Sequence, residues 1–268
     1  MTPSNTPFIS IITVVFNAKE DLEKTIRSIQ KQTFTDFEYI VIDGGSTDGT
    51  LDVINQYNNV ITNWISEPDN GLYDAMNKGI MLTKGKFLWF MNAGDEIYER
   101  TTIEKIFAID GFSSDIYYGE TALIDEEGNI LGTRSKLSAR KLPEKLNWKS
   151  LQIGMVVQHQ SFIVRKEIAP LYDITYKVSA DIDWVIKCLK NTSKIVNSNL
   201  FLSKFLTNIF LGIYHGGGFS SQNYKIALKE RFMIFTKHYG LLTNLYYHAC
   251  IFLKALKRYF KKIIPFSS

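Results

Sequence analysis

The feature that most constrains the fold is a regular alternation of apolar runs and helical patterns between residues 8 and 95. Residues 8–16 (FISIITVVF) are almost continuously apolar and β-branched, which is typical of a strand buried on both faces. Further strands are predicted at 37–42, 59–65 and 86–91, and helices lie between them, the last at 71–82. This order predicts βαβ units and an α/β fold with a Rossmann-like, mostly parallel, doubly wound sheet.

In such sheets, ligands bind at the carboxyl ends of the strands. Four polar residues follow the predicted strands at this edge: Asn17, Asp43, Asp69 and Asp95. Each also has an ordinary explanation, since Asp43 and Asp95 are suited to cap helices and Asp69 lies in a turn sequence. Asn17 is expected to form a capping box with Glu20. The presence of all four residues at one edge, rather than any one of them, therefore predicts that a polar ligand binds there.

The second half of the chain is less regular. Residues 116–133 predict short strands with a turn at 127–129, and residues 179–189 and 220–239 predict helices. Residues 195–214 are apolar but interrupted by polar side chains, so we expect core strands and loops there and no membrane span.

Charge is distributed unevenly along the chain. The net charge is +4, yet no acidic residue follows Glu230, and the seven basic residues after it leave residues 1–230 mildly acidic. Residues 245–264 predict an amphipathic helix with a basic face, which either lies on an anionic membrane surface or docks on the protein with its lysines in water. We therefore predict a catalytic domain at 1–230 and a basic helical tail at 231–268, with no nucleic acid as partner.

Composition and motifs exclude several classes of protein: disordered chains, disulfide-stapled mini-proteins, and NAD-binding or P-loop ATP-binding proteins. Hydrophobic residues make up 45% of the chain and charged residues 22%, which is the balance of an ordinary globular protein. The two cysteines are isolated and no secretory pattern opens the chain, so a cytoplasmic location is expected. Neither a dinucleotide fingerprint nor a P-loop sequence is present.

The chain resembles the inverting glycosyltransferases of family 2, with a bacterial capsule, colanic acid or O-antigen type subgroup as the nearest match. The resemblance covers residues 8–240 and rests on seven motifs in order: ISIITVVFN, YIVIDGGSTDGT, SEPDNGLYDAMNKGI, GKFLWFMNAGDEI, QHQSFIVRKE, SADIDW and HGGGFSS. It implies the GT-A fold and a nucleotide-sugar donor.

The resemblance also implies roles for the donor-side residues. Asp95 matches the ligand of Mn²⁺ or Mg²⁺, and Asn92 stands where the family's Asp-x-Asp-Asp stretch has its first carboxylate. A single protein carboxylate with diphosphate oxygens and water is still able to hold such a cation. The matches to base and nucleotide contacts in relatives are Asp43, Asp69, Thr13 and Asn17.

Two further basic residues are candidates for the site. Many relatives have Arg where Met76 stands, so Lys78 is a candidate cation for the diphosphate, the alternative being a solvated helix lysine. His159 is expected to contact donor or acceptor, although a lone histidine is often structural. His215 and the three glycines after it are expected to border the acceptor or diphosphate side.

Inverting transfer needs a base that faces the acceptor hydroxyl. By resemblance this base is Asp181, whose alternative role is a helix N-cap. Asp183 is the weaker candidate because residues two positions apart on a helix point to different sides of its axis, so Asp183 would not face the same way as Asp181.

Together these observations predict a metal-dependent inverting glycosyltransferase on the cytoplasmic face of the cell membrane. It would transfer a sugar from a nucleotide donor, with UDP expected as the nucleotide, to a polyprenyl-diphosphate-linked saccharide. Two alternatives remain at this point: a sugar-nucleotide pyrophosphorylase, which shares the strand-end layout, and a degenerate transferase that serves as a membrane-associated scaffold.

Overall fold

The computed structural model describes residues 6–125, 127–138, 140–206 and 223–263, and the side chains of these residues except at 205–206 and 254–263. The strands are β1 (Ile9–Val15), β2 (Phe37–Asp43), β3 (Asn63–Ser66), β4 (Phe87–Phe90), β5 (Asp95–Ile97), β6 (Ile116–Ile124), β7 (Ile130–Thr133), β8 (Phe162–Arg165) and β9 (Ile195–Leu206). The helices are α1 (Lys19–Gln30), α2 (Thr50–Gln56), α3 (Leu72–Leu82), α4 (Thr102–Phe107), α5 (Arg134–Leu137), α6 (Ala180–Lys190), α8 (Tyr224–Tyr239) and α9 (Leu241–Ile263). Short 3₁₀ helices are η1 (Trp148–Ile153), η2 (His159–Ser161) and η3 (Lys166–Ile168).

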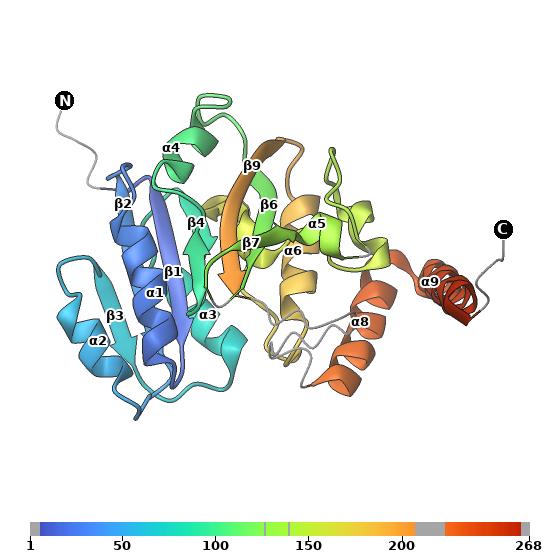
Figure 1. Ribbon diagram of the computed structural model, residues 1–268, viewed down its shortest axis with the longest axis horizontal. Helices are drawn as coiled ribbons and strands as arrows, with labels where there is room; N and C mark the ends of the chain where they lie inside the picture. Colours follow the sequence, from blue (N-terminus) through green and yellow to red (C-terminus); the bar gives the residue numbers. More distant parts are fainter. Residues whose placement is uncertain (1–5, 126, 139, 207–222, 264–268) are drawn as a thin grey trace.

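One mixed sheet runs through the molecule in the order β3-β2-β1-β4-β8-β6-β9-β5, with β7 added to β6 (Figure 1). The strands β3, β2, β1 and β4 are parallel, which confirms the doubly wound arrangement expected for the first half. The second half differs, because β8 pairs antiparallel with both β4 and β6. The unbroken run of parallel neighbours therefore ends at β4, and parallel pairing occurs again between β6 and β9.

Helices cover both faces of the sheet and enclose two cores. Alternate residues of β1 point to opposite faces: Ile11 packs with Ile26 of α1, and Ile12 packs with Met76 of α3. The first core also takes residues from α2 and α4, and the second from α6 and α8. A strand with helices on both sides has to be apolar throughout, which accounts for the unbroken run in the sequence.

The third strand is shorter than its sequence predicts. Residues 59–65 are expected as a strand, but β3 begins only at Asn63. The turn that ends α2 extends into this stretch, since the N–H groups of Val60 and Ile61 donate to the Tyr57 carbonyl at 2.9 and 3.0 Å.

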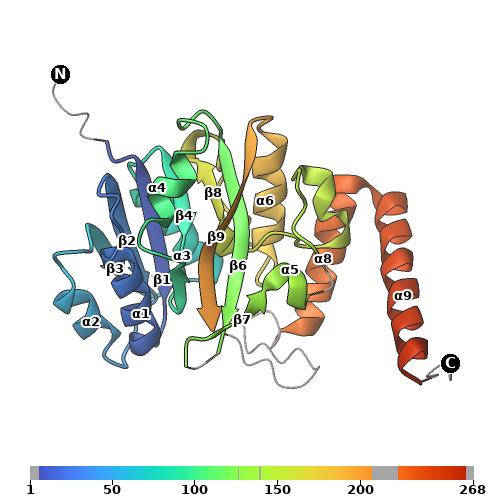
Figure 2. The same ribbon diagram turned by 45° about the horizontal axis from the view of Figure 1, so that its top comes forward.

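In the described part of the chain after residue 222, two helices are present, α8 and α9. α8 packs on α6, and α9 lies beside α8 at the end of the molecule farthest from the N-terminus (Figure 2). Gly240, at φ +84°, joins them. The expected helix at 245–264 is therefore present, and the expected domain boundary after residue 230 falls within α8. Within the described ranges, no helix combines the length and the apolar character that crossing a membrane requires.

Candidate active site

The loops after β1, β2, β3 and β4 lie along one edge of the sheet, because these strands are parallel neighbours. Asn17 and Asp69 lie in these loops, Asp43 is the last residue of β2 and Asp95 is the first of β5, so the four polar residues expected here are all at this edge. We call this edge the donor rim. Its side chains differ widely in burial and in the bonds that they make.

Asp43 is fully buried, and the chain itself occupies its carboxylate. Oδ2 accepts the N–H groups of Gly45 and Ser46 at 3.1 and 3.0 Å. The hydroxyls of Ser66 and Ser46 donate to Oδ2 and Oδ1 at 2.6 and 2.5 Å. The interpretation of Asp43 as a helix cap is wrong, since α2 begins after Gly49. Asp43 instead fixes the shape of the loop that follows β2.

Asn17 joins the end of β1 to that same loop. Its backbone is left-handed, with φ at +47°. Its N–H donates to Ser46 Oγ at 2.7 Å, and its side-chain Oδ1 accepts the N–H of Thr47 at 2.8 Å. Two neighbouring segments of the donor rim are therefore tied together by one exposed amide side chain.

The capping box expected between Asn17 and Glu20 is wrong. α1 begins at Lys19, and its N-cap Ala18 has no side-chain oxygen to offer. The next βα unit supplies the missing acceptor, because Asp48 Oδ2 accepts the N–H of Lys19 at 3.2 Å. An acceptor from another loop replaces the local cap, as unsatisfied N–H groups at a helix start require.

Asp69 lies directly against Gly44, where a side chain would leave its carboxylate no room. A Cβ atom at Gly44 would lie 2.6 Å from Asp69 Oδ2 and 3.3 Å from the Phe16 ring. Phe16 is 63% exposed, although it directly follows a buried strand. Phe16 falls within the strand predicted at 8–16, and nothing in that apolar run indicates that its ring would face water. An aromatic ring next to a carboxylate is suited to stack on a base and bind its polar edge.

Thr13 lies beneath the donor rim, in the core. Its side chain is fully buried, donates to the Met91 carbonyl at 2.6 Å and accepts from the Tyr39 hydroxyl at 3.0 Å. The expected nucleotide contact by Thr13 therefore has no exposed atom to make it. Thr13 links β1 to β4 and β2 instead.

Lys78 is held by acidic neighbours. Its ammonium group lies 2.8 Å from Glu67 Oε1 and 3.8 Å from Asp74 Oδ2, and it donates to the Pro68 carbonyl at 3.1 Å. The hydrogen bond that Lys78 donates to Glu67, with the charges of Glu67, Asp74 and Asp69, raises the pKa of Lys78 despite some desolvation. Lys78 thus braces the loop that carries Asp69, and its charge is already matched there.

Asp95 occupies the far end of the donor rim and is 9% exposed. Its Oδ1 accepts from Gln160 Nε2 at 3.2 Å, and its Oδ2 accepts from the Asn92 N–H at 3.1 Å. Burial raises the pKa of Asp95 to about 7, with only partial compensation by the Asn92 N–H. A carboxylate in this environment gains from a nearby cation.

The residues at Asp95 suit a divalent cation that is held largely by its substrate. Asn92 Oδ1 is buried and has no hydrogen-bond partner, and Asp95 is the carboxylate next to it. Both are hard oxygen donors of the kind that Mg²⁺ and Mn²⁺ prefer, and diphosphate oxygens and water complete such a shell. No group of three or more His, Cys, Asp and Glu side chains with metal-binding geometry occurs in the described ranges, so a cage made by the protein alone is absent there.

Asp181 lies in the first turn of α6. Its Oδ1 accepts from the Tyr73 hydroxyl at 3.2 Å. Burial raises the pKa of Asp181, and the Ile182 N–H, Tyr73 and the charge of Arg231 only partly offset this rise. A raised pKa makes the carboxylate a stronger base once it is ionised.

A series of side-chain contacts, with one step along the backbone from His159 to Gln160, connects the two carboxylates. Tyr73 stacks on Tyr172 with ring centroids 5.5 Å apart, and the Tyr172 hydroxyl lies 2.7 Å from His159 Nε2. The next residue in the chain is the glutamine that donates to Asp95. The series is Asp181, Tyr73, Tyr172, His159, Gln160 and Asp95. The structure therefore brings Asp95, His159 and Asp181 to one wall.

His159 is neutral at ordinary pH in this wall. Its ring packs against Phe90, Tyr172 and Trp184, with centroids 5.1, 6.0 and 5.6 Å away. Burial lowers the pKa of His159 to about 4. Its bond to Tyr172 orients the wall of the site, which is the structural role weighed as its alternative.

Asp183, the weaker candidate for the base, is held by ion pairs within the fold. It is fully buried and pairs with Lys187 at 2.6 Å, His238 at 2.7 Å and Lys237 at 3.4 Å. These contacts connect α6 to α8 on the side away from Asp181.

Glu230 positions the start of α6 and was not found from the sequence. Its buried carboxylate accepts three successive backbone N–H groups, those of Lys177 at 2.6 Å and of Val178 and Ser179 at 2.9 Å. Asp181 follows two residues later. No local pattern indicated this contact, because Glu230 is 51 residues further along the chain than Ser179. The expected loop at His215 to Gly218 lies outside the described residues.

Comparison with known proteins places these residues in a family context. Residues 10–169 match the model of the family described as Glycosyl transferase family 2. A curated relative is the PGL/p-HBAD biosynthesis glycosyltransferase of Mycobacterium bovis, which is 32% identical over 198 residues, or 70% of this chain and 72% of the relative. Glycosyltransferase AglE of Haloferax volcanii is 27% identical over 49% of this chain and 45% of its own length.

Solved structures share the fold at low sequence identity. S. aureus TarS 1-349 has a TM-score of 0.65 at 18% identity, over 90% of this chain and 71% of that one. In a longer TarS structure the chain spans 39% of the length. The mannosyltransferase PcManGT from Pyrobaculum calidifontis, solved with GDP-Man and Mn²⁺, has a TM-score of 0.61 at 13% identity over 91% of this chain. These likenesses support the α/β fold described above.

Proposed function

The chain belongs to glycosyl transferase family 2, and from this membership we propose that it is an inverting enzyme that moves a sugar from a UDP-sugar to a lipid-linked saccharide. The observation that carries the proposal is the wall that joins Asp95 to Asp181. It presents a donor-side carboxylate at one end and, at the other, a second carboxylate that has a raised pKa.

On the donor side, the nucleotide would lie along the donor rim. The exposed Phe16 ring and the Asp69 carboxylate offer a stacking surface and an acceptor for the polar edge of a base. UDP is proposed because a uracil has an N–H for a carboxylate to accept. TarS has been solved with UDP-GlcNAc and PcManGT with GDP-Man, so this fold accommodates both nucleotides in other proteins.

A divalent cation would be held by Asp95, by Asn92 Oδ1 and by the donor's own diphosphate oxygens. Its chemistry would be the neutralisation of negative charge on the departing nucleoside diphosphate. The protein's part is to keep Asp95 oriented, which Gln160 does through its side-chain amide.

On the acceptor side, Asp181 would take the proton of the attacking hydroxyl. Tyr73 donates to its Oδ1 and so fixes the carboxylate's direction, and Glu230 holds the backbone in front of it. The sugar's anomeric carbon would then be attacked from the face opposite the leaving group, which gives inversion.

The acceptor is proposed to be a polyprenyl-diphosphate-linked saccharide at the inner face of the membrane, in polysaccharide assembly of the capsule, colanic acid or O-antigen type. Support comes from α9, where Leu242, Tyr246 and Phe252 are 84%, 64% and 64% exposed. Five basic residues follow in its sequence between 254 and 262. Apolar and basic residues on one helix are typical of binding to anionic lipid surfaces.

The test is sugar transfer from a panel of UDP-sugars to a polyprenyl-diphosphate-linked saccharide, with and without Mn²⁺. Asp181→Asn and Asp95→Asn should each lower the transfer rate at least a hundredfold. Asp52→Asn, at an exposed position of α2, is the matched control and should keep full activity.

Two results would count against the proposal. Full activity in both site variants would reject the assignment of Asp95 and Asp181. Release of pyrophosphate from a nucleoside triphosphate and a sugar phosphate would favour a pyrophosphorylase instead.

A further inference from the structure

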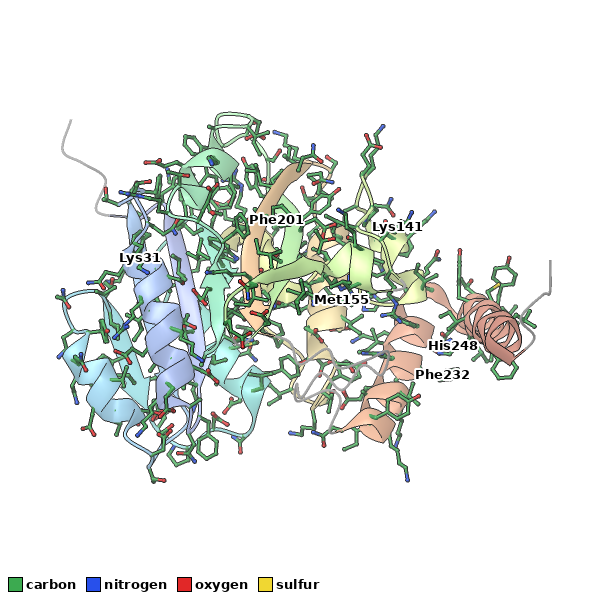
Figure 3. The ribbon with its side chains drawn as sticks, in the orientation of Figure 1. Lys31, Lys141, Met155, Phe201, Phe232 and His248 are labelled. Atoms are coloured by element: carbon green, nitrogen blue, oxygen red, sulfur yellow. The ribbon has the colours of Figure 1, made fainter. Side chains whose placement is uncertain are left out.

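Three arginines from different segments lie close enough for their charges to act on one another, and the charge of one of them, Arg231, also acts on Asp181. Arg134 belongs to α5, Arg140 follows that helix, and Arg231 lies in α8; we call them the arginine cluster. Burial, followed by the charges of Arg231 and Arg134, lowers the pKa of Arg140 to about 10. Figure 3 labels Met155 and Lys141 on this side of the molecule, where α5, α6 and α8 come together.

The backbone around the arginine cluster is shaped to hold guanidinium groups. A Cβ atom at Gly154 would lie 2.4 Å from Arg140 Cζ and 2.5 Å from each of its terminal nitrogens, so the guanidinium rests directly on this glycine. Gly154 also has φ at +110°, a conformation that other residues rarely adopt. Arg134, 9% exposed, donates to the carbonyls of Val156 and Met155 at 2.8 and 2.5 Å. The cluster is therefore built into the fold.

Two members of this cluster keep a charge without a paired carboxylate. In the parts of the chain described here, neither Arg140 nor Arg231 has a carboxylate within ion-pair distance, and Arg231 Nε is buried without a hydrogen-bond partner. Asp181 is near enough for the charge of Arg231 to act on it.

Holding Arg140 and Arg231 together, with no paired carboxylate among the described residues, destabilises the protein when no ligand is bound. Removing charged groups from water without a counter-charge is unfavourable, and gathering like charges adds repulsion. Guanidinium groups bind phosphate oxygens in pairs through two parallel hydrogen bonds. An anionic ligand would therefore satisfy groups that the chain leaves unsatisfied.

We propose that the arginine cluster binds the phosphate or diphosphate group of the acceptor, so that the saccharide attached to it reaches Asp181. This inference rests on the proposed function. The cluster acts on Asp181 through the charge of Arg231 and is built by α5, η1 and α8, whereas the donor rim is built by the ends of β1 to β4. The position favours the acceptor's phosphate over that of the donor.

The test is calorimetric titration of the full chain with farnesyl diphosphate, a short isoprenyl diphosphate, and separately with UDP. Arg140→Gln and Arg231→Gln should each weaken farnesyl diphosphate binding at least tenfold and change UDP binding less than twofold. Lys141→Gln removes an exposed positive charge next to the cluster and should leave both affinities within twofold.

A second pair of variants guards against loss of folding. Arg140→Lys and Arg231→Lys keep the charge but lose the planar fork, and should weaken farnesyl diphosphate binding several-fold with unchanged melting temperature. Unchanged binding in all four arginine variants would overturn the proposal, as would a wild-type protein that does not bind farnesyl diphosphate. Loss of UDP binding instead would assign the cluster to the donor.

This design separates the two proposals. Failure of the proposed function would appear as a lack of UDP binding and of sugar transfer, with farnesyl diphosphate binding still dependent on Arg140 and Arg231. Failure of the present inference would leave UDP binding and transfer intact, with no effect of the arginine variants on farnesyl diphosphate.

Discussion

Replacing Glu230 by glutamine should destabilise the protein and misplace Asp181 at the same time. The wild-type carboxylate accepts from Lys177 with Oε1 and from Val178 and Ser179 with Oε2. A glutamine is able to keep its oxygen toward the last two N–H groups, but its NH₂ then faces the N–H of Lys177. One buried donor loses its acceptor, and the two remaining bonds lose their charge.

The expected cost follows from these three bonds. Leaving one buried donor unpaired costs about 1–3 kcal/mol, and weakening the two other bonds adds about 1 kcal/mol. We therefore expect Glu230→Gln to lower the free energy of unfolding by about 3 kcal/mol, and Glu230→Ala to lower it further. The turnover of sugar transfer should fall at least tenfold, because the segment before Asp181 loses its anchor, while UDP binding at the donor rim stays the same.

Urea unfolding followed by circular dichroism measures the free energy of unfolding. Steady-state kinetics measures the turnover of sugar transfer, and a separate titration measures UDP binding. Lys229→Gln, an exposed change on the same helix, is the control and should alter the unfolding free energy by less than about 0.5 kcal/mol. A Glu230→Gln protein as stable and as active as the wild type would refute the positioning argument. Equal losses of turnover and UDP affinity would show a general disturbance of the fold.

Three further predictions concern the donor rim, the pH dependence and the tail. Phe16→Ala should weaken UDP binding about tenfold by calorimetry, because base stacking on an aromatic ring contributes about 1–3 kcal/mol; Phe16→Tyr should bind as the wild type does, and an unchanged Phe16→Ala affinity would remove the ring from the site. Burial alone would raise the pKa of Asp183, but the hydrogen bonds from His238 and Lys187 prevail and lower it to about 2. The Asp183 carboxylate therefore stabilises the folded protein above its unfolded pKa of about 3.9, and this stabilisation is lost as the pH falls toward 2. Acid unfolding of Asp183→Asn should show a weaker dependence on pH over that interval. A profile identical to that of the wild type would contradict the assignment. Deletion after Tyr239 should abolish binding to vesicles that contain anionic lipid without removing UDP binding, and retained vesicle binding would reject the role of α9.

The parallel half of the fold was predictable from sequence because its signals are local. The apolar runs of β1, β2 and β4 and the polar residue after each are contiguous in the chain, and the parallel order brings them to one edge. Asp43 and Asp95 were placed there correctly. What those carboxylates bind was less predictable, since Asp43 turns inward to its own loop.

Residues whose partners are distant in sequence were assigned less well. Thr13 is separated from Met91 by 78 positions, and nothing in the strand pattern indicates that its hydroxyl would be used there. The salt bridge of Lys78 to Glu67 depends on how the loop after β3 folds back on α3. The three arginines of the cluster are spread over nearly a hundred positions. Only their meeting in space shows that they form a group.

Glu230 and Arg231 are consecutive residues of α8, yet one anchors the backbone before Asp181 and the other belongs to the arginine cluster. A helix moves nearly as a rigid rod, so a sliding or tilting of α8 displaces both at once. Under the proposals above, the grip on the acceptor and the aim of the base are mechanically coupled. A variant that adapts α8 to a different acceptor must therefore also restore the alignment of Asp181, which limits how freely acceptor preference is able to drift among relatives with this helix.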